Sequence, residues 1–206
     1  LERIQLALTT GRTQGNLQYT VDISNNPELE TLDLSNLTTM DTSLIISNNT
    51  RLNQVLVGKT SQMGGELKII DNPALTVINF ESLTDIAGHL TMSNNVILQS
   101  AETDFASLVS INGDVLLTLL HNYNVPQFPA LTTVAGSVNI SDLGQQNDAN
   151  LNLSQLTDLD GTLSIDRFAG KRIELDRLIN TSDIVTFSNN PNPVEINISE
   201  GSSWGG

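Results

Sequence analysis

Short groups of apolar residues recur along the chain at intervals of about 23–25 residues. The clearest copy covers 65–86 and reads Gly-x-Leu-x-Ile-x-x-Asn-Pro-x-Leu-x-x-Ile-x-Phe-x-x-Leu-x-x-Ile. Five copies open on a glycine, namely Gly65, Gly88, Gly113, Gly136 and Gly161. The first apolar pairs of the copies are Val21/Ile23, Leu44/Ile46, Leu67/Ile69, Leu90/Met92, Val115/Leu117, Val138/Ile140, Leu163/Ile165 and Val185/Phe187. The pattern therefore indicates about eight structural repeats.

Each copy contains three apolar groups, and their spacing predicts strands. Leu67-x-Ile69 and Ile78-x-Phe80 alternate with period two, and Leu83-x-x-Ile86 closes the copy. Short period-two segments between polar turns are typical of strands rather than helices. A three-residue strand cannot bury its apolar face alone, so equivalent strands of successive copies must stack. The sequence predicts an all-β fold, a three-sided parallel β-helix of about eight turns.

One asparagine per copy falls at the corner after the first strand. Asn26, Asn49, Asn72 and Asn95 are each 23 residues apart. Asparagine favours turns in general, but the regular spacing favours an inward asparagine ladder. Its hydrogen bonds would satisfy corner groups that cost about 1–3 kcal/mol each when buried unpaired. The ladder should break, and two turns should bulge, at Asn122 and over 143–147.

The 65–86 pattern resembles the repeat of receptor L domains, which occur in insulin- and EGF-receptor-type proteins. Related repeats occur in fungal GPI-anchored cell-wall and sporulation proteins and in other microbial surface proteins. The resemblance covers 17–198 and is strongest over 65–92, 107–116, 129–141 and 155–166. It implies a right-handed β-helix related to leucine-rich repeats, in a cell-surface protein that is not an enzyme. The chain has no cysteine-rich module, which favours the microbial or wall-type branch.

The domain boundaries follow from the repeat. Residues 15–199 are expected to form a single solenoid domain, with an N-terminal cap over 1–14 and a Gly/Ser-rich linker or tail over 200–206. Leu1, Ile4 and Leu8 share a helical face, so the cap is either a short helix or an additional edge strand. The open C-terminal edge is expected to be covered by a following domain or by another copy of the protein.

The amino-acid composition argues against some classes of binding partner. The 206 residues include 9 Lys+Arg and 23 Asp+Glu, a formal net charge of -14. Such a surface repels phosphate backbones, which argues against nucleic acid. No apolar run reaches the roughly 20 residues of a spanning helix, so no direct membrane insertion is expected. There is no cysteine, and hydrogen bonding between turns can replace disulfides in such a fold.

Six Asn-x-Ser/Thr sequons are candidate N-glycosylation sites. They are at Asn36, Asn48, Asn139, Asn152, Asn180 and Asn197. Strand alternation turns Asn139, Asn152 and Asn197 outward, and the other three fall at turns or element ends. A glycan is therefore a candidate modification, provided that the protein passes through a eukaryotic secretory pathway.

The basic residues are unevenly distributed. No Lys or Arg occurs between Lys68 and Arg167, whereas Arg167, Lys171, Arg172 and Arg177 lie close together. This cluster could contact the acidic middle of another molecule head to tail. Solvated charge around an irregular turn is the simpler interpretation.

The sequence gives little support for a catalytic or metal-binding site. Asp158, Asp160 and Asp166 are grouped, as in β-helix enzymes that cleave polysaccharides, but no other copy presents matching acids. The sequence also lacks the Asp-x-Asp-x-Asp-Gly loop with a terminal Glu that is typical of calcium sites.

The remaining motifs also lack the context that chemistry requires. Residues 201–205 match Gly-x-Ser-x-Gly, but without the strand and helix of a nucleophile elbow. His89 and His121 have no partner at metal-ligand spacing. We expect no catalytic residue, no metal and no cofactor.

Two functional hypotheses of different class remain. The first is a non-enzymatic extracellular structural or adhesion module of a cell surface, wall or filament, as part of a longer glycoprotein. The second is an ectodomain that captures a peptide or glycan on a solenoid face. A polysaccharide-active enzyme is a minor third. Outward positions such as Asn139, Ser164 and Thr186 are small and polar, with Lys68 as an exception. This favours the first hypothesis, with protein contacts through self-assembly or neighbouring domains.

Overall fold

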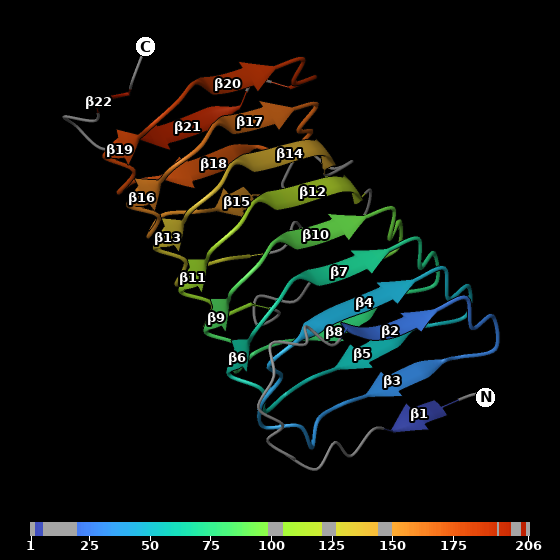
Figure 1. Ribbon diagram of the computed structural model, residues 1–206. Coiled ribbons are helices and arrows are strands. Elements are labelled where there is room, and N and C mark those ends of the chain that lie inside the picture. The colour runs from blue at the N-terminus through green and yellow to red at the C-terminus, as the bar shows by residue number, and fades with distance from the viewer. Residues whose placement is uncertain are drawn as a thin grey trace.

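The computed structural model is an all-β solenoid in which parallel strands stack turn upon turn along one axis (Figure 1). It describes residues 3–5, 20–98, 105–120, 127–143, 150–192, 194–198 and 203–204. The two chain ends lie at opposite ends of the axis. Within these residues every element is a strand, and no helix is long and apolar enough to cross a membrane.

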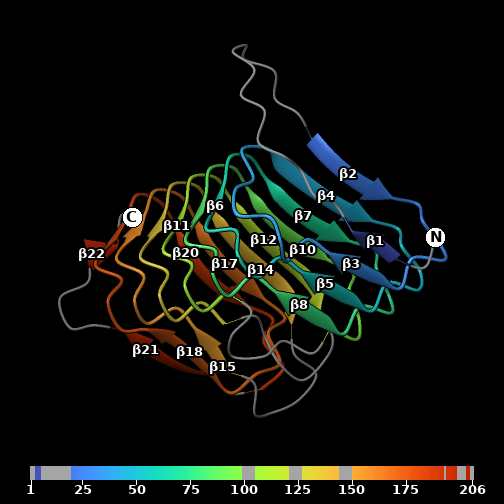
Figure 2. The same ribbon diagram turned by 90° about the horizontal axis from the view of Figure 1, so that it is seen from below.

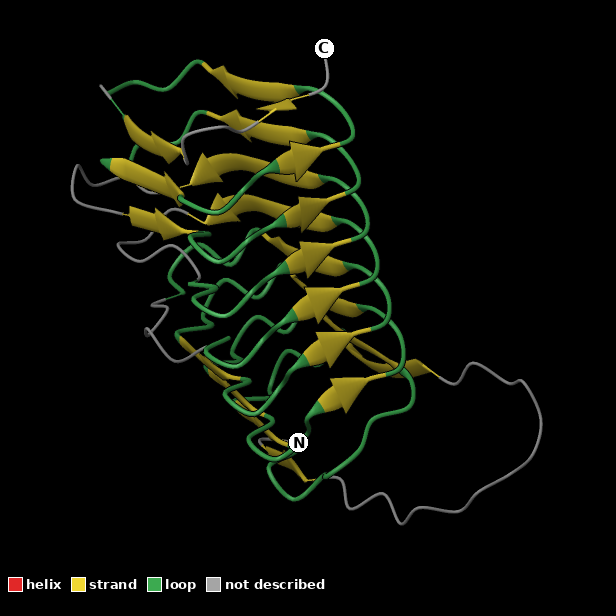
Figure 3. Ribbon diagram, turned by 90° about the vertical axis from the view of Figure 1, so that its left-hand side faces the viewer, coloured by secondary structure: helices red, strands yellow, loops and turns green. Residues whose placement is uncertain are grey.

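Two faces of the solenoid are continuous sheets. The eight-stranded sheet contains β2 (Thr20–Ser24), β4 (Ser43–Ser47), β7 (Leu67–Ile70), β10 (Leu90–Ser93), β12 (Val115–Leu120), β14 (Val138–Leu143), β17 (Leu163–Asp166) and β20 (Val185–Ser188). The seven-stranded sheet, which faces the viewer in Figure 3, contains β6 (Gln62–Met63), β9 (Asp85–Ile86), β11 (Ser110–Ile111), β13 (Thr133–Val134), β16 (Asp158–Leu159), β19 (Asn180–Thr181) and β22 (Ser203–Trp204).

The third face is divided between two smaller sheets. One contains β1 (Arg3–Gln5), β3 (Thr31–Asp33), β5 (Gln54–Leu56) and β8 (Val77–Asn79). The other contains β15 (Asn150–Asn152), β18 (Arg172–Leu175) and β21 (Glu195–Ile198). Figure 2 shows these two sheets apart from each other, toward the two ends of the molecule.

The predicted fold class is confirmed. The strands wind around three faces in a right-handed sense, as most parallel connections do (Figures 1 and 3). The expected number of about eight turns was slightly too high. The solenoid has about seven turns, which separate the eight stacked strands of the largest sheet. The bulges expected at Asn122 and over 143–147 lie outside the described residues, except for Leu143, which ends β14.

Both chain ends contribute strands. In the N-terminal cap, β1 pairs in parallel with β3, with Arg3 opposite Thr31. The described part of the cap is therefore an edge strand and not a helix. At the other end, β22 pairs with β19, so two residues of the expected tail extend the seven-stranded sheet.

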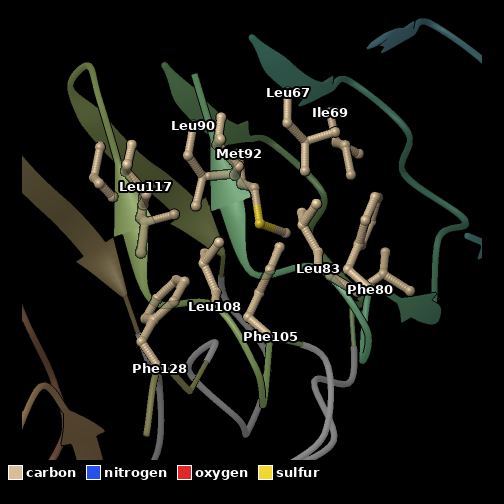
Figure 4. Packing of buried hydrophobic residues seen from close by; sticks show 14 of the residues in the cluster. Leu67, Ile69, Phe80, Leu83, Leu90, Met92, Phe105, Leu108, Leu117 and Phe128 are labelled. Atoms are coloured by element: carbon tan, nitrogen blue, oxygen red, sulfur yellow. The ribbon is translucent and has the colours of Figure 1, made fainter. Parts of the chain in front are cut away.

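The three faces enclose one apolar core. In the copy over 65–86, Leu67, Ile69 and Leu83 are fully buried, and Figure 4 shows these side chains directed toward one interior. The rings of Phe80, Phe105 and Phe128 stack along the axis, with centroids 5.5 and 5.3 Å apart. These separations are close to the strand spacing of about 4.8 Å, so each ring packs directly on the next turn.

The repeated glycines lie where the chain passes from the seven-stranded to the eight-stranded sheet. A Cβ atom on Gly113 would lie 2.9 Å from the carbonyl carbon of Gly88, one turn away, and a Cβ on Gly136 would lie 2.8 Å from that of Gly113. Packed atoms do not approach that closely. Close contact between successive turns therefore explains the glycine spacing in the sequence.

Candidate functional site

The asparagines predicted to form a ladder are linked from turn to turn. The backbone N–H of Asn49 donates to Oδ1 of Asn72 (3.1 Å), and Nδ2 of Asn49 donates to the carbonyl of Ile23 (2.8 Å). The N–H of Asn72 donates in the same way to Oδ1 of Asn95 (3.1 Å). Asn49, Asn72 and Asn95 are 0% exposed. Each side chain thus satisfies buried backbone groups of the preceding turn.

The residue before each ladder position has a left-handed backbone. These residues are Asn25, Asn48, Asp71, Asn94, Leu119, Asp142, Arg167 and Asn189, with φ between 50° and 59°. The conformation disfavours most L-residues, whereas Asn and Asp tolerate it through local hydrogen bonding. This column was not predicted from the sequence, although an Asn or Asp is present at six of the eight corners.

The ladder position changes character in the later turns. Leu120, Leu143 and Phe168 occupy it and are buried. There β12 and β14 continue past the left-handed residue, and Leu120 pairs with Leu143. Asn190 restores an amide in the last turn, where its Oδ1 accepts from the N–H of Phe168 (2.8 Å). Asn190 was not predicted, but the segment Ser-Asn-Asn-Pro over 188–191 repeats that over 24–27.

The sequon asparagines differ in exposure. Asn36, Asn48 and Asn139 are exposed, at the turn after β3, at the corner after β4 and within β14. Asn152 and Asn197 are half-buried, and the side chain of Asn180 lies outside the described part of the structure.

Asn152 is already engaged. Its Oδ1 accepts from the N–H (3.1 Å) and the hydroxyl (2.8 Å) of Ser154. The exposed amides of Asn36, Asn48 and Asn139 are therefore the most accessible of the sequons whose side chains the structure describes.

Part of the basic cluster links neighbouring turns. Nε and Nη2 of Arg167 donate to the Asp142 carboxylate (2.6 and 2.8 Å), and its Nη1 contacts Asp166. These bonds, led by the one to Asp142, raise the pKa of Arg167. Arg172 donates to Glu195 of the next turn (3.0 Å). Two of the four clustered cations thus serve contacts within the molecule.

The grouped aspartates do not form one site. Asp158 is exposed on β16 and Asp160 is exposed at the following corner, whereas Asp166 ends β17 on the eight-stranded sheet. Hydrogen bonds from Asn189 and Ser188 lower the pKa of Asp166. The arrangement spreads these acids over different faces, in contrast to the paired carboxylates of glycosidases.

The histidines also give no support for a catalytic or metal-binding role. His89 is exposed, and its Nδ1 accepts from the backbone N–H of Asp114 (2.9 Å). His121 lies outside the described residues. Among the described residues no group of three His, Cys, Asp or Glu could hold a metal ion.

The outer surface of the eight-stranded sheet carries a column of hydroxyl groups. One register position holds Ser24, Ser47, Ser93, Thr118, Ser141 and Ser188, interrupted by Ile70 and Asp166. The hydroxyls of Ser24 and Ser47 lie 2.7 Å apart, and that of Ser141 donates to Thr118 (2.9 Å). The eight-stranded sheet thus carries mainly small polar side chains at its outward positions, with Ile45, Lys68, Ile70 and Leu116 as exceptions.

The chain matches no family model, no curated protein and no solved structure. Its function must therefore be argued from its own residues.

Proposed function

We propose that the protein is a non-enzymatic extracellular module that serves structure or adhesion at a cell surface, wall or filament. It belongs to a longer glycoprotein in this proposal, of the kind that the resemblance to receptor L domains implies. The observation that carries the proposal is the placement of Asn36, Asn48 and Asn139. Each is an exposed sequon asparagine on a different turn of a continuous hydrogen-bonded solenoid.

The architecture supports this role. Rows of backbone hydrogen bonds join every turn to the next without a disulfide, so the fold does not depend on a redox compartment. The outward positions of the eight-stranded sheet bear mainly small polar side chains, which suit a solvated wall or coat. The ion pairs of Arg167 and Arg172 tie turns together rather than converge on a ligand.

Glycan attachment tests the proposal. The full chain is secreted from eukaryotic cells, and its intact mass is measured before and after treatment with a peptide N-glycosidase. We expect sugar on the wild type and a loss of one glycan in each of Asn36→Gln, Asn48→Gln and Asn139→Gln. Asn152→Gln is the matched control, because Asn152 is half-buried and its Oδ1 accepts from Ser154. Secreted protein of unmodified mass would overturn the proposal.

The hydroxyl column favours a second candidate, capture of a glycan on the eight-stranded sheet. Hydroxyls at regular spacing can exchange hydrogen bonds with sugar hydroxyls. Binding to immobilised polysaccharide should then disappear in Ser93→Arg, near the middle of the face, without a change in the unfolding temperature. Equal binding by the variant and the wild type would contradict this second candidate.

A further inference from the structure

The C-terminal end of the solenoid leaves its inward side chains partly uncovered. Val185, Phe187 and Ile196 are only partly buried, whereas Leu163, Ile165 and Ile173, which occupy the same positions one turn earlier, are fully buried. Ile184 is 58% exposed. β20 and β21 each have a strand partner on one side only within the described residues. This end therefore combines apolar surface with two open strand edges.

The asparagine ladder has a direction, which makes the two ends complementary. In each link, a backbone N–H donates to the Asn Oδ1 of the next turn, as Asn26 does to Asn49 (3.0 Å). At the C-terminal end, the N–H of Asn190 has no acceptor among the described residues. At the N-terminal end, Oδ1 of Asn26 has no donor among them. One end thus offers the donor and the other end offers the acceptor.

The two ends also share their corner sequence and geometry. Both carry Ser-Asn-Asn-Pro, over 24–27 and over 188–191. The second residue is left-handed in both, with φ of 59° at Asn25 and 51° at Asn189. A turn with the structure of 20–27 can therefore stack on the last turn as each turn stacks on its neighbour within the chain.

One strand stands in the way. If β20 pairs with β2 of another copy in the register of the other turns, β21 falls beside β3, with Ile196 opposite Leu32. That place is held by β1, whose Ile4 is opposite Leu32. Arg3-Ile4-Gln5 and Glu195-Ile196-Asn197 share a charged, apolar, amide order. β1 thus occupies the position that a docking copy needs.

We propose that the protein stacks end to end, with the last turn of one copy docked on the first turn of a second copy and β21 replacing β1 beside β3. This inference rests on the proposed structural role and names its partner. Each joint buries the apolar end and extends the ladder from Asn190 to Asn26. Because the two ends are unlike, the stack is open and grows beyond a dimer. β1 is a cap that docking displaces.

Proline at position 22 blocks one side of the joint. Within the eight-stranded sheet, inward residues direct their N–H toward the next turn, as Leu44 does to Glu66 (2.9 Å). By strand alternation, the N–H of Asp22 points away from β4, to the open edge. Asp22 is exposed, and proline is tolerated where an edge N–H faces solvent. Asp22→Ala is the matched control, since it removes the carboxylate but keeps the N–H.

The experiment follows sedimentation velocity of the unglycosylated full chain over a wide concentration series. The wild type and Asp22→Ala should grow past a dimer with concentration, and Asp22→Pro should remain a monomer at the same unfolding temperature. Ile4→Pro, which weakens the cap, should assemble at a concentration about tenfold lower than the wild type.

Three results would overturn the inference: a wild type that stays monomeric, association that stops at two copies, or assembly of Asp22→Pro like that of Asp22→Ala. If Ile4→Pro fails to fold, the comparison at Asp22 still decides. The glycan test uses secreted protein and a different readout, so the stacking and the extracellular role can fail independently.

Discussion

Replacing Gly113 with alanine is expected to force two turns of the solenoid apart. The new Cβ would lie 2.8 Å from Nδ1 of His89 and 2.9 Å from both the carbonyl carbon and the carbonyl oxygen of Gly88. The exposed His89 ring can rotate away. Gly88 cannot, because its N–H is bonded to the carbonyl of Gly65 (3.1 Å). Relief therefore requires the backbone of stacked turns to move.

The size of the effect follows from two opposing contributions. Overpacking that shifts the backbone costs about 1–3 kcal/mol. Alanine also lowers the conformational entropy of the unfolded chain, which stabilises the folded state by about 0.4–1 kcal/mol. The backbone of Gly113 is not left-handed, so no conformational strain adds to this. We expect a net loss of about 1–2 kcal/mol, or a Tm lower by about 2–8 °C for a chain of this length.

Gly58→Ala is the matched control. Its nearest atom would be Oε1 of Glu81 at 4.0 Å, and its backbone is not left-handed either. Alanine at position 58 should therefore leave stability unchanged or raise it by up to about 1 kcal/mol. Thermal and urea unfolding, followed by far-ultraviolet circular dichroism, compares the two variants with the wild type. A Gly113→Ala protein as stable as Gly58→Ala would refute the argument from tight stacking.

Three further substitutions test other parts of the fold. Asn72→Leu should lower the unfolding free energy by about 2–4 kcal/mol in urea titrations, because it leaves the buried N–H of Asn49 and a strand carbonyl without their partner. Leu119→Asn should raise the Tm by about 2–4 °C in calorimetry, because it relieves about 1 kcal/mol of left-handed strain at an exposed leucine. Hydrogen bonds from Ser110 (2.6 Å) and Thr84 hold the pKa of Asp85 below its ordinary value. The ionised Asp85 carboxylate therefore stabilises the fold above about pH 4, and this stabilisation is lost as the pH falls through the pKa of Asp85 in the folded protein. Ser110→Ala should raise the pKa of Asp85 in carboxyl NMR titrations. The variant should be less stable than the wild type at neutral pH, and this difference in unfolding free energy should shrink in acid.

The repeat made the fold predictable from sequence. Leu67, Ile69, Ile78 and Leu83 alternate or space themselves as inward positions on three faces, and stacking is the arrangement that buries them all. The same regularity located the asparagines over 26–95, because an amide at a constant spacing has the same neighbours in every turn. Periodicity thus specified both the core and the corner.

The features that the repeat did not predict lie at repeated positions whose residue type changes along the chain. Asp142 and Arg167 occupy equivalent corners of successive turns, 25 residues apart, and their ion pair depends on the residue type at each corner, which changes from turn to turn. The left-handed column was overlooked because Leu119 and Arg167 obscure an otherwise regular Asn/Asp position. Asn190 was overlooked because three apolar residues separate it from the earlier ladder.

The change from Asn to apolar residues along the ladder has a structural cause. In the turn that holds Asn72, β7 ends at Ile70, so the chain leaves the sheet at the corner and its backbone needs a side-chain partner. In the turns that hold Leu120 and Leu143, the strands run on through the corner, and these two residues pair with each other. Backbone bonding there replaces the amide, and a buried leucine becomes the better choice because it adds apolar contact without a polar group to satisfy. Leucine at position 72 would meet no such extended strand. The same substitution therefore destabilises the early turns, although the protein itself carries leucine in the later ones.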